Sequence, residues 1–135
     1  MDNPIPCIRA SNISFRWPNS QNEILSFEKF HVNKNETLFI QGTSGSGKTT
    51  LLNLITGVLL PDKGSISILN KEITGLKPAL RDQFRADHFG IIFQQFNLIN
   101  YLSVLENILL PCTFSQRRKL MVETVNTSLV DEASR

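Results

Sequence analysis

Cysteine and long apolar runs are scarce in this sequence, and each scarcity excludes a class of protein. The two cysteines, Cys7 and Cys112, lack the C-x-x-C spacing of a zinc or redox site, so neither a metal centre nor a disulfide framework is predicted. No apolar run approaches the roughly 20 residues that span a bilayer. Residues 1–6 lack the basic and apolar regions of a secretory signal. We therefore expect a cytoplasmic chain that reaches a membrane only through a partner.

An excess of either charge is also lacking. Fourteen Lys and Arg against twelve Asp and Glu leave a formal net charge of +2, too weak to predict nucleic acid as a partner. Arg117, Arg118 and Lys119 form a basic cluster that is typical of a solvated helix face. With 135 residues and 41% hydrophobic content, the chain predicts one globular unit with one core.

What the sequence does contain is an octapeptide of the form G-x-x-x-x-G-K-[ST] at residues 42–49. Residues 37–41 have the length and the β-branched and aromatic content of a buried strand, and the apolar density of residues 48–59 predicts a helix. Strand, glycine-rich loop and helix thus follow in the order that a phosphate-binding loop requires. The alternative, a flexible Gly/Ser loop with an incidental lysine, does not explain this order.

Each residue type in the loop suits a nucleoside triphosphate. Glycines can adopt positive φ and have no Cβ to keep phosphate oxygens from the backbone N–H groups, and a helix N-terminus favours an anion. Lys48 would reach the β- and γ-phosphates, and the Thr49 hydroxyl would coordinate the Mg²⁺ that bridges them. The predicted nucleotide-binding residues are Gly42, Thr43, Ser44, Gly45, Ser46, Gly47, Lys48, Thr49 and Thr50.

Periodicity predicts strands before and after this loop. Ile13, Phe15 and Trp17 alternate with polar residues as in a half-buried strand, and residues 24–32 and 65–69 are also predicted to be extended. Residues 89–93 are nearly all apolar, which is typical of a strand covered on both faces of a parallel sheet.

Three helices are predicted in the second half. Residues 78–87 form a short charged segment with a proline suited to its first turn. The Ser-x-x-Glu spacing that begins at Ser103 predicts a capping box and a helix that ends near Pro111. The spacing from Val122 to Ala133 predicts one face of a last helix.

At several separated places, in the right order, the chain resembles the nucleotide-binding subunit of ATP-binding cassette (ABC) transporters. Residues 42–57 are similar to the Walker A motif and its helix, residues 61–66 to the turn into the next strand, and residues 89–94 to the strand that leads into the Q-loop. Residues 95–111 are similar to the segment that enters the helical subdomain. They most resemble the lipoprotein-release and macrolide-export branch.

The resemblance implies roles for two residues outside the loop. Gln94 stands at the place of the Q-loop glutamine, which implies that it coordinates Mg²⁺ or the attacking water. Taken alone, it is equally typical of a surface amide after a strand. Trp17 stands where the family keeps an aromatic residue, usually tyrosine, that stacks on adenine, and tryptophan offers a larger π-face. Taken alone, it is more typical of a core residue.

The resemblance also implies the fold and the surroundings. We expect an α/β fold with a truncated P-loop NTPase (RecA-like) core, an antiparallel β-subdomain and the start of a helical subdomain. Residues 1–93 would form the β-subdomain and the start of the core, and residues 94–135 the Q-loop and the beginning of the helical subdomain. The implied cofactors are ATP and Mg²⁺. The implied partners are a transmembrane permease and a second nucleotide-binding subunit, at the inner face of the cell membrane.

Residues 1–135 contain no signature loop of the LSGGQ type, no Walker B strand and no switch histidine. Residues 129–132 resemble a Walker B end only superficially, because they continue the helical spacing from Val122. Phosphoryl transfer depends on positioning and charge stabilisation around an in-line water. We therefore expect this chain alone to bind Mg-ATP, to hydrolyse it negligibly, and to expose the apolar faces of residues 89–93 and 48–59.

Two alternatives stay open at this point. One is a non-hydrolysing nucleotide-binding or dimer-interfering fragment. The other is a P-loop kinase, against which the residues Phe93, Gln94 and Gln95 and the strands before the loop argue.

Overall fold

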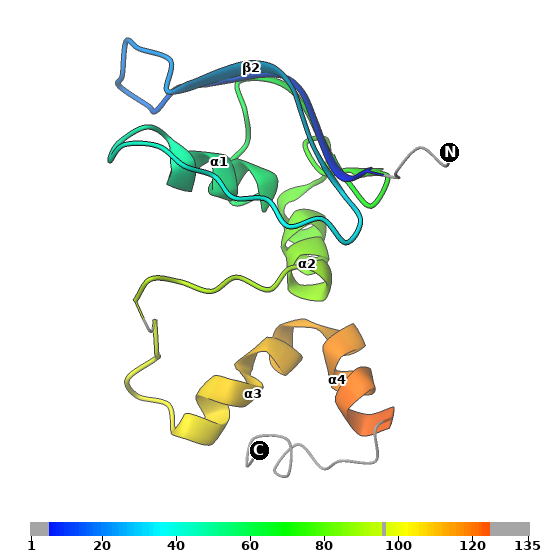
Figure 1. The fold of residues 1–135 in the computed structure, drawn as a ribbon. Coiled ribbons are helices and arrows are strands. Elements are labelled where there is room, and N and C mark those ends of the chain that lie inside the picture. The colour runs from blue at the N-terminus through cyan, green and yellow to red at the C-terminus, as the bar shows by residue number, and fades with distance from the viewer. Residues whose placement is uncertain (1–5, 96, 125–135) are drawn as a thin grey trace. The chain divides into compact units, whose positions relative to one another are not determined.

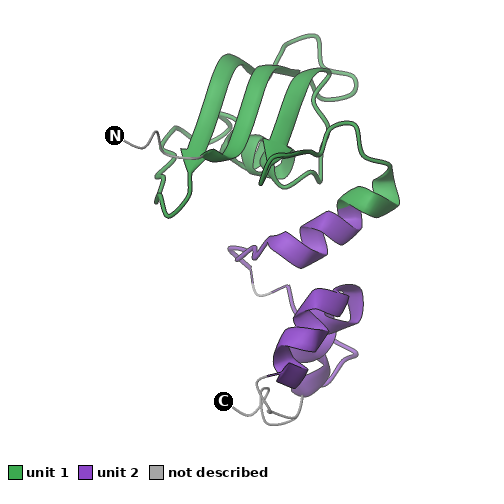
Figure 2. Ribbon diagram, turned by 90° about the vertical axis from the view of Figure 1, so that its right-hand side faces the viewer, with its two compact units in different colours: residues 1–81 green, residues 82–135 purple. Residues whose placement is uncertain are grey.

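The computed structural model describes residues 6–95 and 97–124. The chain divides into two compact units, residues 1–81 and residues 82–135 (Figure 2). The elements follow in the order β1, β2, α1, β3, β4, α2, α3 and α4 (Figure 1). The boundary between the units falls inside α2 (Pro78–His88). The predicted subdivision at residues 93 and 94 stays a prediction.

The first unit is built on an antiparallel sheet. β1 (Pro6–Phe15), β2 (Leu25–Asn33), β3 (Lys63–Ile68) and β4 (Lys71–Glu72) lie in the order β2-β1-β3-β4. This confirms the strands predicted around Ile13 and Phe15, at residues 24–32 and at residues 65–69. Leu69 and Asn70 both have positive φ, so the turn from β3 to β4 is a tight hairpin.

A bulge sets the register between β1 and β3. The pairing shifts between Ser11 and Ser14, and Gly64 on the partner strand has a φ of +91°. A Cβ at Gly64 would collide with the backbone oxygens of Ser11 and Asn12. Only glycine therefore fits at this position, and the bulge determines where β1 ends and where Trp17 begins its turn.

α1 (Lys48–Ile55) lies along one face of the sheet (Figures 1 and 2). The apolar side chains of α1 and of the inner sheet face share one core. Its buried members, together with Ile73 after β4, are Ala10, Ile13, Phe15, Leu54, Ile55, Ile66 and Ile68.

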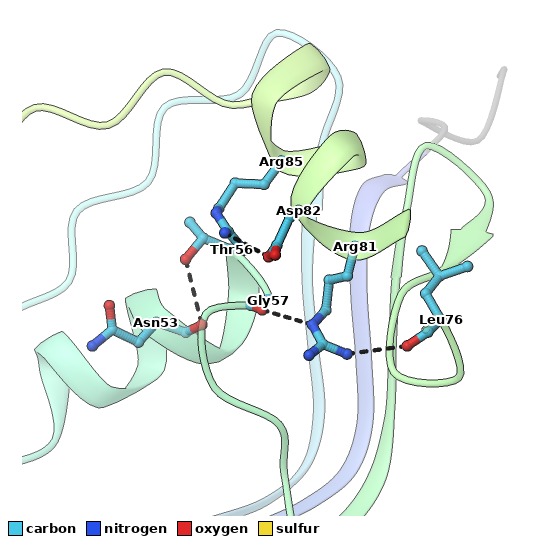
Figure 3. A network of polar contacts seen from close by, with 7 residues as sticks. All are labelled: Asn53, Thr56, Gly57, Leu76, Arg81, Asp82 and Arg85. Atoms are coloured by element: carbon cyan, nitrogen blue, oxygen red, sulfur yellow. Dashed lines mark hydrogen bonds and ion pairs between the residues drawn. The ribbon is translucent and has the colours of Figure 1, made fainter. Parts of the chain in front are cut away.

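α1 is shorter than the helix predicted over residues 48–59. Gly57 has a φ of +70°, its N–H bonds to the Leu54 carbonyl, and the Val58 N–H bonds to the Asn53 carbonyl. This pattern is a Schellman motif, which ends the helix. The Arg81 side chain then donates to the carbonyl oxygens of Gly57, at 3.0 Å, and Leu76, at 3.1 Å (Figure 3).

Two predicted strands are not formed. Residues 37–41 and 89–93 have no regular secondary structure, and Phe39 and Ile92 are 84% and 99% exposed. A strand buried on both faces needs a neighbouring strand and covering layers, and neither segment pairs with another strand among residues 6–95 and 97–124. The expected exposure of residues 89–93 is confirmed for residues 91–93. In α1, Leu52 is exposed as expected, whereas Leu54 and Ile55 are buried.

The second unit contains the end of α2, then α3 (Val104–Phe114) and α4 (Gln116–Thr124). The predicted capping box is present, because the Glu106 N–H donates to the Ser103 hydroxyl and the Ser103 N–H donates to the Glu106 carboxylate. The helix does not stop at Pro111, however, and continues to Phe114. The remainder of the predicted last helix, and residues 129–132 with it, lies outside the described residues. No helix in the described part is long and apolar enough to span a membrane.

Candidate functional site: a glycine loop beside a single tryptophan

The glycine loop enters α1 through left-handed backbone. Gly45 and Gly47 have φ values of +78° and +90°, and Gly47 is the N-cap of α1. The φ of Gly42 is not positive, so only Gly45 and Gly47 of the three glycines use this freedom. A Cβ at Gly42 would lie 2.5 Å from the Ser46 hydroxyl oxygen, so alanine at this position would require that hydroxyl group to move.

The Lys48 side chain hydrogen-bonds to the backbone of its own loop. Its ammonium group donates to the carbonyl oxygens of Gly42, at 2.8 Å, and Thr43, at 2.7 Å, with the Ser46 hydroxyl at 3.4 Å. The Ser46 N–H also bonds to the Thr43 carbonyl, which closes a turn around the ammonium group. The positive charge is therefore already held at the centre of the loop by neutral acceptors, where it remains available to an anion.

The first turn of α1 has no side chain to satisfy its N–H groups. No side chain caps the helix at Gly47, and the first turn contains no acidic residue. These N–H groups and the helix dipole therefore favour a negatively charged ligand. The Thr49 side chain is exposed at this end, whereas Thr50 is buried against the core.

The loop rests against the start of β2. A Cβ on Gly47 would lie 3.0 Å from Leu25 Cδ2 and 3.3 Å from Ile24 Cγ2. A Cβ on Gly45, in contrast, would meet nothing within 4 Å. One glycine thus allows close packing onto the sheet, and the other leaves open space on the side where a ligand would approach.

Trp17 comes to the loop through the turn between β1 and β2. Its ring makes an edge contact with Phe15, at 5.2 Å between ring centroids, and remains 41% exposed. The Asp62 carboxylate accepts the Arg16 N–H at 2.9 Å, and the Asp62 N–H donates to the Ser14 carbonyl at 2.8 Å. Asp62 therefore holds the backbone next to Trp17. From the sequence, Asp62 was predicted only to be part of a turn.

A pocket of 230 Å³ joins the tryptophan to the loop. Its lining residues are Trp17, Ile24, Gly45, Gly47, Lys48, Thr49 and Thr50. The only formal charge among them is the ammonium group of Lys48, which makes the pocket electrostatically suited to an anion. The structure thus brings together six of the predicted site residues, and Gly42, Thr43, Ser44 and Ser46 complete the same loop.

Gln94 is not among the residues that line this pocket. It is exposed and belongs to the second unit, so its predicted position at the phosphates stays a prediction. Among the described residues, no group of three or more His, Cys, Asp or Glu side chains is arranged to hold a metal ion. A Mg²⁺ ion at the pocket would depend on the Thr49 hydroxyl and on phosphate oxygens. Such a ligand set is usual for a nucleotide-bound Mg²⁺.

Most of the chain is similar in sequence to known proteins. Residues 26–134 match the family model described as ABC transporter. The chain is 42% identical over 111 residues to the bacitracin export ATP-binding protein BceA of Halalkalibacterium halodurans, over 81% of this chain and 44% of that protein. It is 29% identical over 116 residues to the macrolide export ATP-binding/permease protein MacB of Salmonella choleraesuis, over 83% of this chain and 18% of that protein.

The fold also matches solved structures. The ATP-binding cassette MJ0796, in a dimeric post-hydrolysis state bound to ADP and Pi, superposes with a TM-score of 0.73 at 33% identity, over 79% of this chain and 47% of that chain. This match confirms the predicted fold class, a P-loop NTPase core with an antiparallel β-subdomain. The chain spans less than half of the length of each of these three proteins.

Proposed function

The chain belongs to the ABC transporter family, and from this premise we propose that it binds Mg-ATP for a transporter that exports its substrate. The observation that carries the proposal is the single pocket in which Trp17 meets Lys48 and the uncapped start of α1. An aromatic face at one end and a cation with free N–H groups at the other match a nucleotide, which has a flat base and a polyphosphate.

Three side chains of the pocket have proposed roles in nucleotide binding. Lys48 would bind the β- and γ-phosphates, and backbone N–H groups of the glycine loop and of the first turn of α1 would surround their oxygens. Trp17 would stack on the adenine ring, since its side chain is partly exposed and its ring is held in a T-shaped contact with Phe15. Thr49 would coordinate Mg²⁺. Gln94 would join the metal or the attacking water, as the resemblance to the Q-loop suggests.

The surroundings of the whole protein are part of the same proposal. We propose a transmembrane permease as partner and a location on the inner face of the cell membrane. The similarity to MacB, which is named as an ATP-binding/permease protein, supports this. We also propose a second copy of the nucleotide-binding subunit, which the dimeric state of MJ0796 supports. Export is the direction named for both BceA and MacB.

The binding test uses the protein's own fluorescence. Trp17 is the only tryptophan, so its emission reports on the pocket directly. We expect ATP with Mg²⁺ to change this emission in a saturable way, and Lys48→Ala to weaken binding about tenfold or more, because a charge-assisted bond to phosphate is lost. Lys34→Ala, which removes an equal charge from an exposed turn of the same unit, is the matched control and should bind normally.

Calorimetry on the same samples measures the affinity for ATP independently of tryptophan fluorescence. Absence of binding heat with ATP, or equal affinity in wild type and Lys48→Ala, would contradict the proposal. Turnover is measured in parallel. Among the described residues, no Asp, Glu or His lines the pocket, so none of these lining side chains can take the proton of an attacking water. We expect binding without turnover, and steady hydrolysis that Lys48→Ala abolishes would refute this expectation.

A further inference from the structure

Within the second unit, the end of α2 and the start of α4 are joined by a buried hydroxyl. Ser115 is completely buried, and its hydroxyl donates to the Asp87 carboxylate at 2.6 Å. The same hydroxyl oxygen accepts the Arg118 N–H at 3.1 Å and so caps α4. One buried group therefore connects two helices that are separated in the chain by residues 89–114.

Arg118 makes the reverse connection, from α4 to α2. Its Nε donates to the Ala86 carbonyl at 2.7 Å, and its Nη2 donates to the Phe89 carbonyl at 2.6 Å. Carbonyl groups in the last turn of a helix have no partner within the helix, so the guanidinium group satisfies them. The expectation that the basic cluster is entirely a solvated face is wrong for Arg118. A run of basic residues does not reveal which member will face a neighbouring helix end.

These contacts close a ring of the chain. The segment between them, residues 89–114, begins at Phe89, whose carbonyl Arg118 holds, and ends immediately before Ser115. Gln94 lies near the start of this segment and has no regular secondary structure to position it. Inside the segment, the Asn107 side chain hydrogen-bonds to both the N–H and the carbonyl of Ile99. Residues 99 and 107 are therefore held together by contacts that do not involve Ser115 or Arg118.

We propose that Asp87, Ser115 and Arg118 form a latch that fixes both ends of residues 89–114 and thereby positions Gln94. The latch residues are positioning residues, because they act through the backbone of the segment. The importance of Gln94 rests on the proposed function, whereas the latch itself does not. A closed latch restricts the segment, and an open latch frees it while the helices remain folded.

The test is backbone NMR on the full chain, with Arg118→Lys and Ser115→Ala as variants. Lysine keeps the charge but offers one ammonium group where arginine uses two separate N–H donors. We expect hydrogen exchange at the Phe89 N–H, which bonds to the Arg85 carbonyl at 3.0 Å, to accelerate about tenfold or more in both variants. Order parameters of residues 92–95 should fall. The matched control is Lys119→Ala, which removes a neighbouring exposed cation and should change neither quantity.

Two internal amides separate the latch from general destabilisation. The Asn107 N–H, bonded to the Ser103 carbonyl within α3, and the Ile73 N–H, bonded to the Ile66 carbonyl in the first unit, should exchange at unchanged rates. Unchanged exchange at Phe89 and unchanged order parameters would overturn the proposal. An equal acceleration at Phe89, Asn107 and Ile73 would overturn it too, because that pattern reports global unfolding.

A second measurement keeps the latch distinct from the proposed function. The contact between Asp87 and Ser115 predicts that Asp87→Ala and Ser115→Ala are strongly non-additive in their effect on the Phe89 exchange rate, and additive effects would overturn the latch. None of these measurements requires nucleotide. If Trp17 in the wild type fails to respond to ATP, the proposed function fails, while the exchange data still decide whether the latch exists.

Discussion

Alanine at Gly47 tests whether the conformation of the loop, and not only its charge, creates the site. Gly47 combines a φ of +90° with the N-cap position of α1. An added Cβ would lie 3.0 Å from Leu25 Cδ2 and 3.3 Å from Ile24 Cγ2, which is tight but not prohibitive. The substitution leaves every charge and every polar side chain of the pocket in place.

The expected cost in free energy follows from the left-handed φ of Gly47 and from the contacts of the added Cβ. Left-handed backbone costs an L-residue about 1–2 kcal/mol. The contact with Leu25 adds little, because a methyl group at the end of a side chain can move by a few tenths of an ångström. If the variant keeps the loop conformation, it loses this amount of stability. If the loop relaxes, the nucleotide must restore it on binding, which weakens affinity by about 5- to 30-fold.

Two titrations on one sample measure both routes. ATP titration followed by Trp17 emission gives the affinity, urea unfolding gives the stability, and the two losses should sum to about 1–2 kcal/mol. Gly75→Ala is the matched control, because its φ is not in the left-handed region and its Cβ would find only the Glu72 carboxylate, 3.7 Å away. If Gly47→Ala matches the wild type in both quantities, the conformational argument for this loop is refuted.

Three further predictions concern stability. Arg81→Lys should lower the free energy of unfolding by about 1.5–3 kcal/mol, because one ammonium group cannot replace two donors to separate carbonyls (Figure 3); urea unfolding measures this, and an unchanged midpoint would argue against the role. Ser103→Ala should cost α3 about 1 kcal/mol through loss of its cap, seen as faster amide exchange in α3, whereas Ser103→Asp should retain protection. The hydroxyl of Ser115 and then the amide of Gln83 donate to the Asp87 carboxylate, which holds the pKa of that carboxyl below its usual range. Its stabilising contribution is therefore present above the unfolded pKa, about 4, and is lost as pH falls through the lower folded pKa. Protection at the latch should be equal at neutral pH and at about pH 5, then decline below about pH 4, and a decline already at about pH 6 would contradict this assignment.

Local patterns predicted local features well. The capping box at Ser103 is present because both of its partners lie within one helical turn. The spacing of the glycine loop placed Gly47 and Lys48 at the start of α1, since that junction depends on neighbours in the chain. The alternation around Ile13 and Phe15 also predicted a half-buried strand correctly. Each of these features is set by interactions over only a few residues.

Patterns that require distant partners were less informative. Residues 37–41 and 89–93 have the composition of covered strands, but no strand pairs with them in the described part of the chain. The composition of a segment indicates whether its side chains favour burial. Whether the segment forms a strand also depends on which other strands are available to pair with it. The helix limit at residue 59 was wrong for a related reason, since Gly57 ends α1 in a conformation that apolar density does not reveal.

The sequence by itself determined that this protein has a phosphate-binding loop, because glycine, lysine and threonine at fixed spacing act through adjacent backbone. Tertiary structure decided how distant residues come to lie beside that loop or beside a helix end. Trp17 reaches the pocket because the β1 and β3 pairing and the Asp62 carboxylate hold its turn. Arg118, similar in sequence to its basic neighbours, reaches the end of α2 because α4 begins beside it. Such contacts join residues far apart in the chain, so only the folded arrangement determines them.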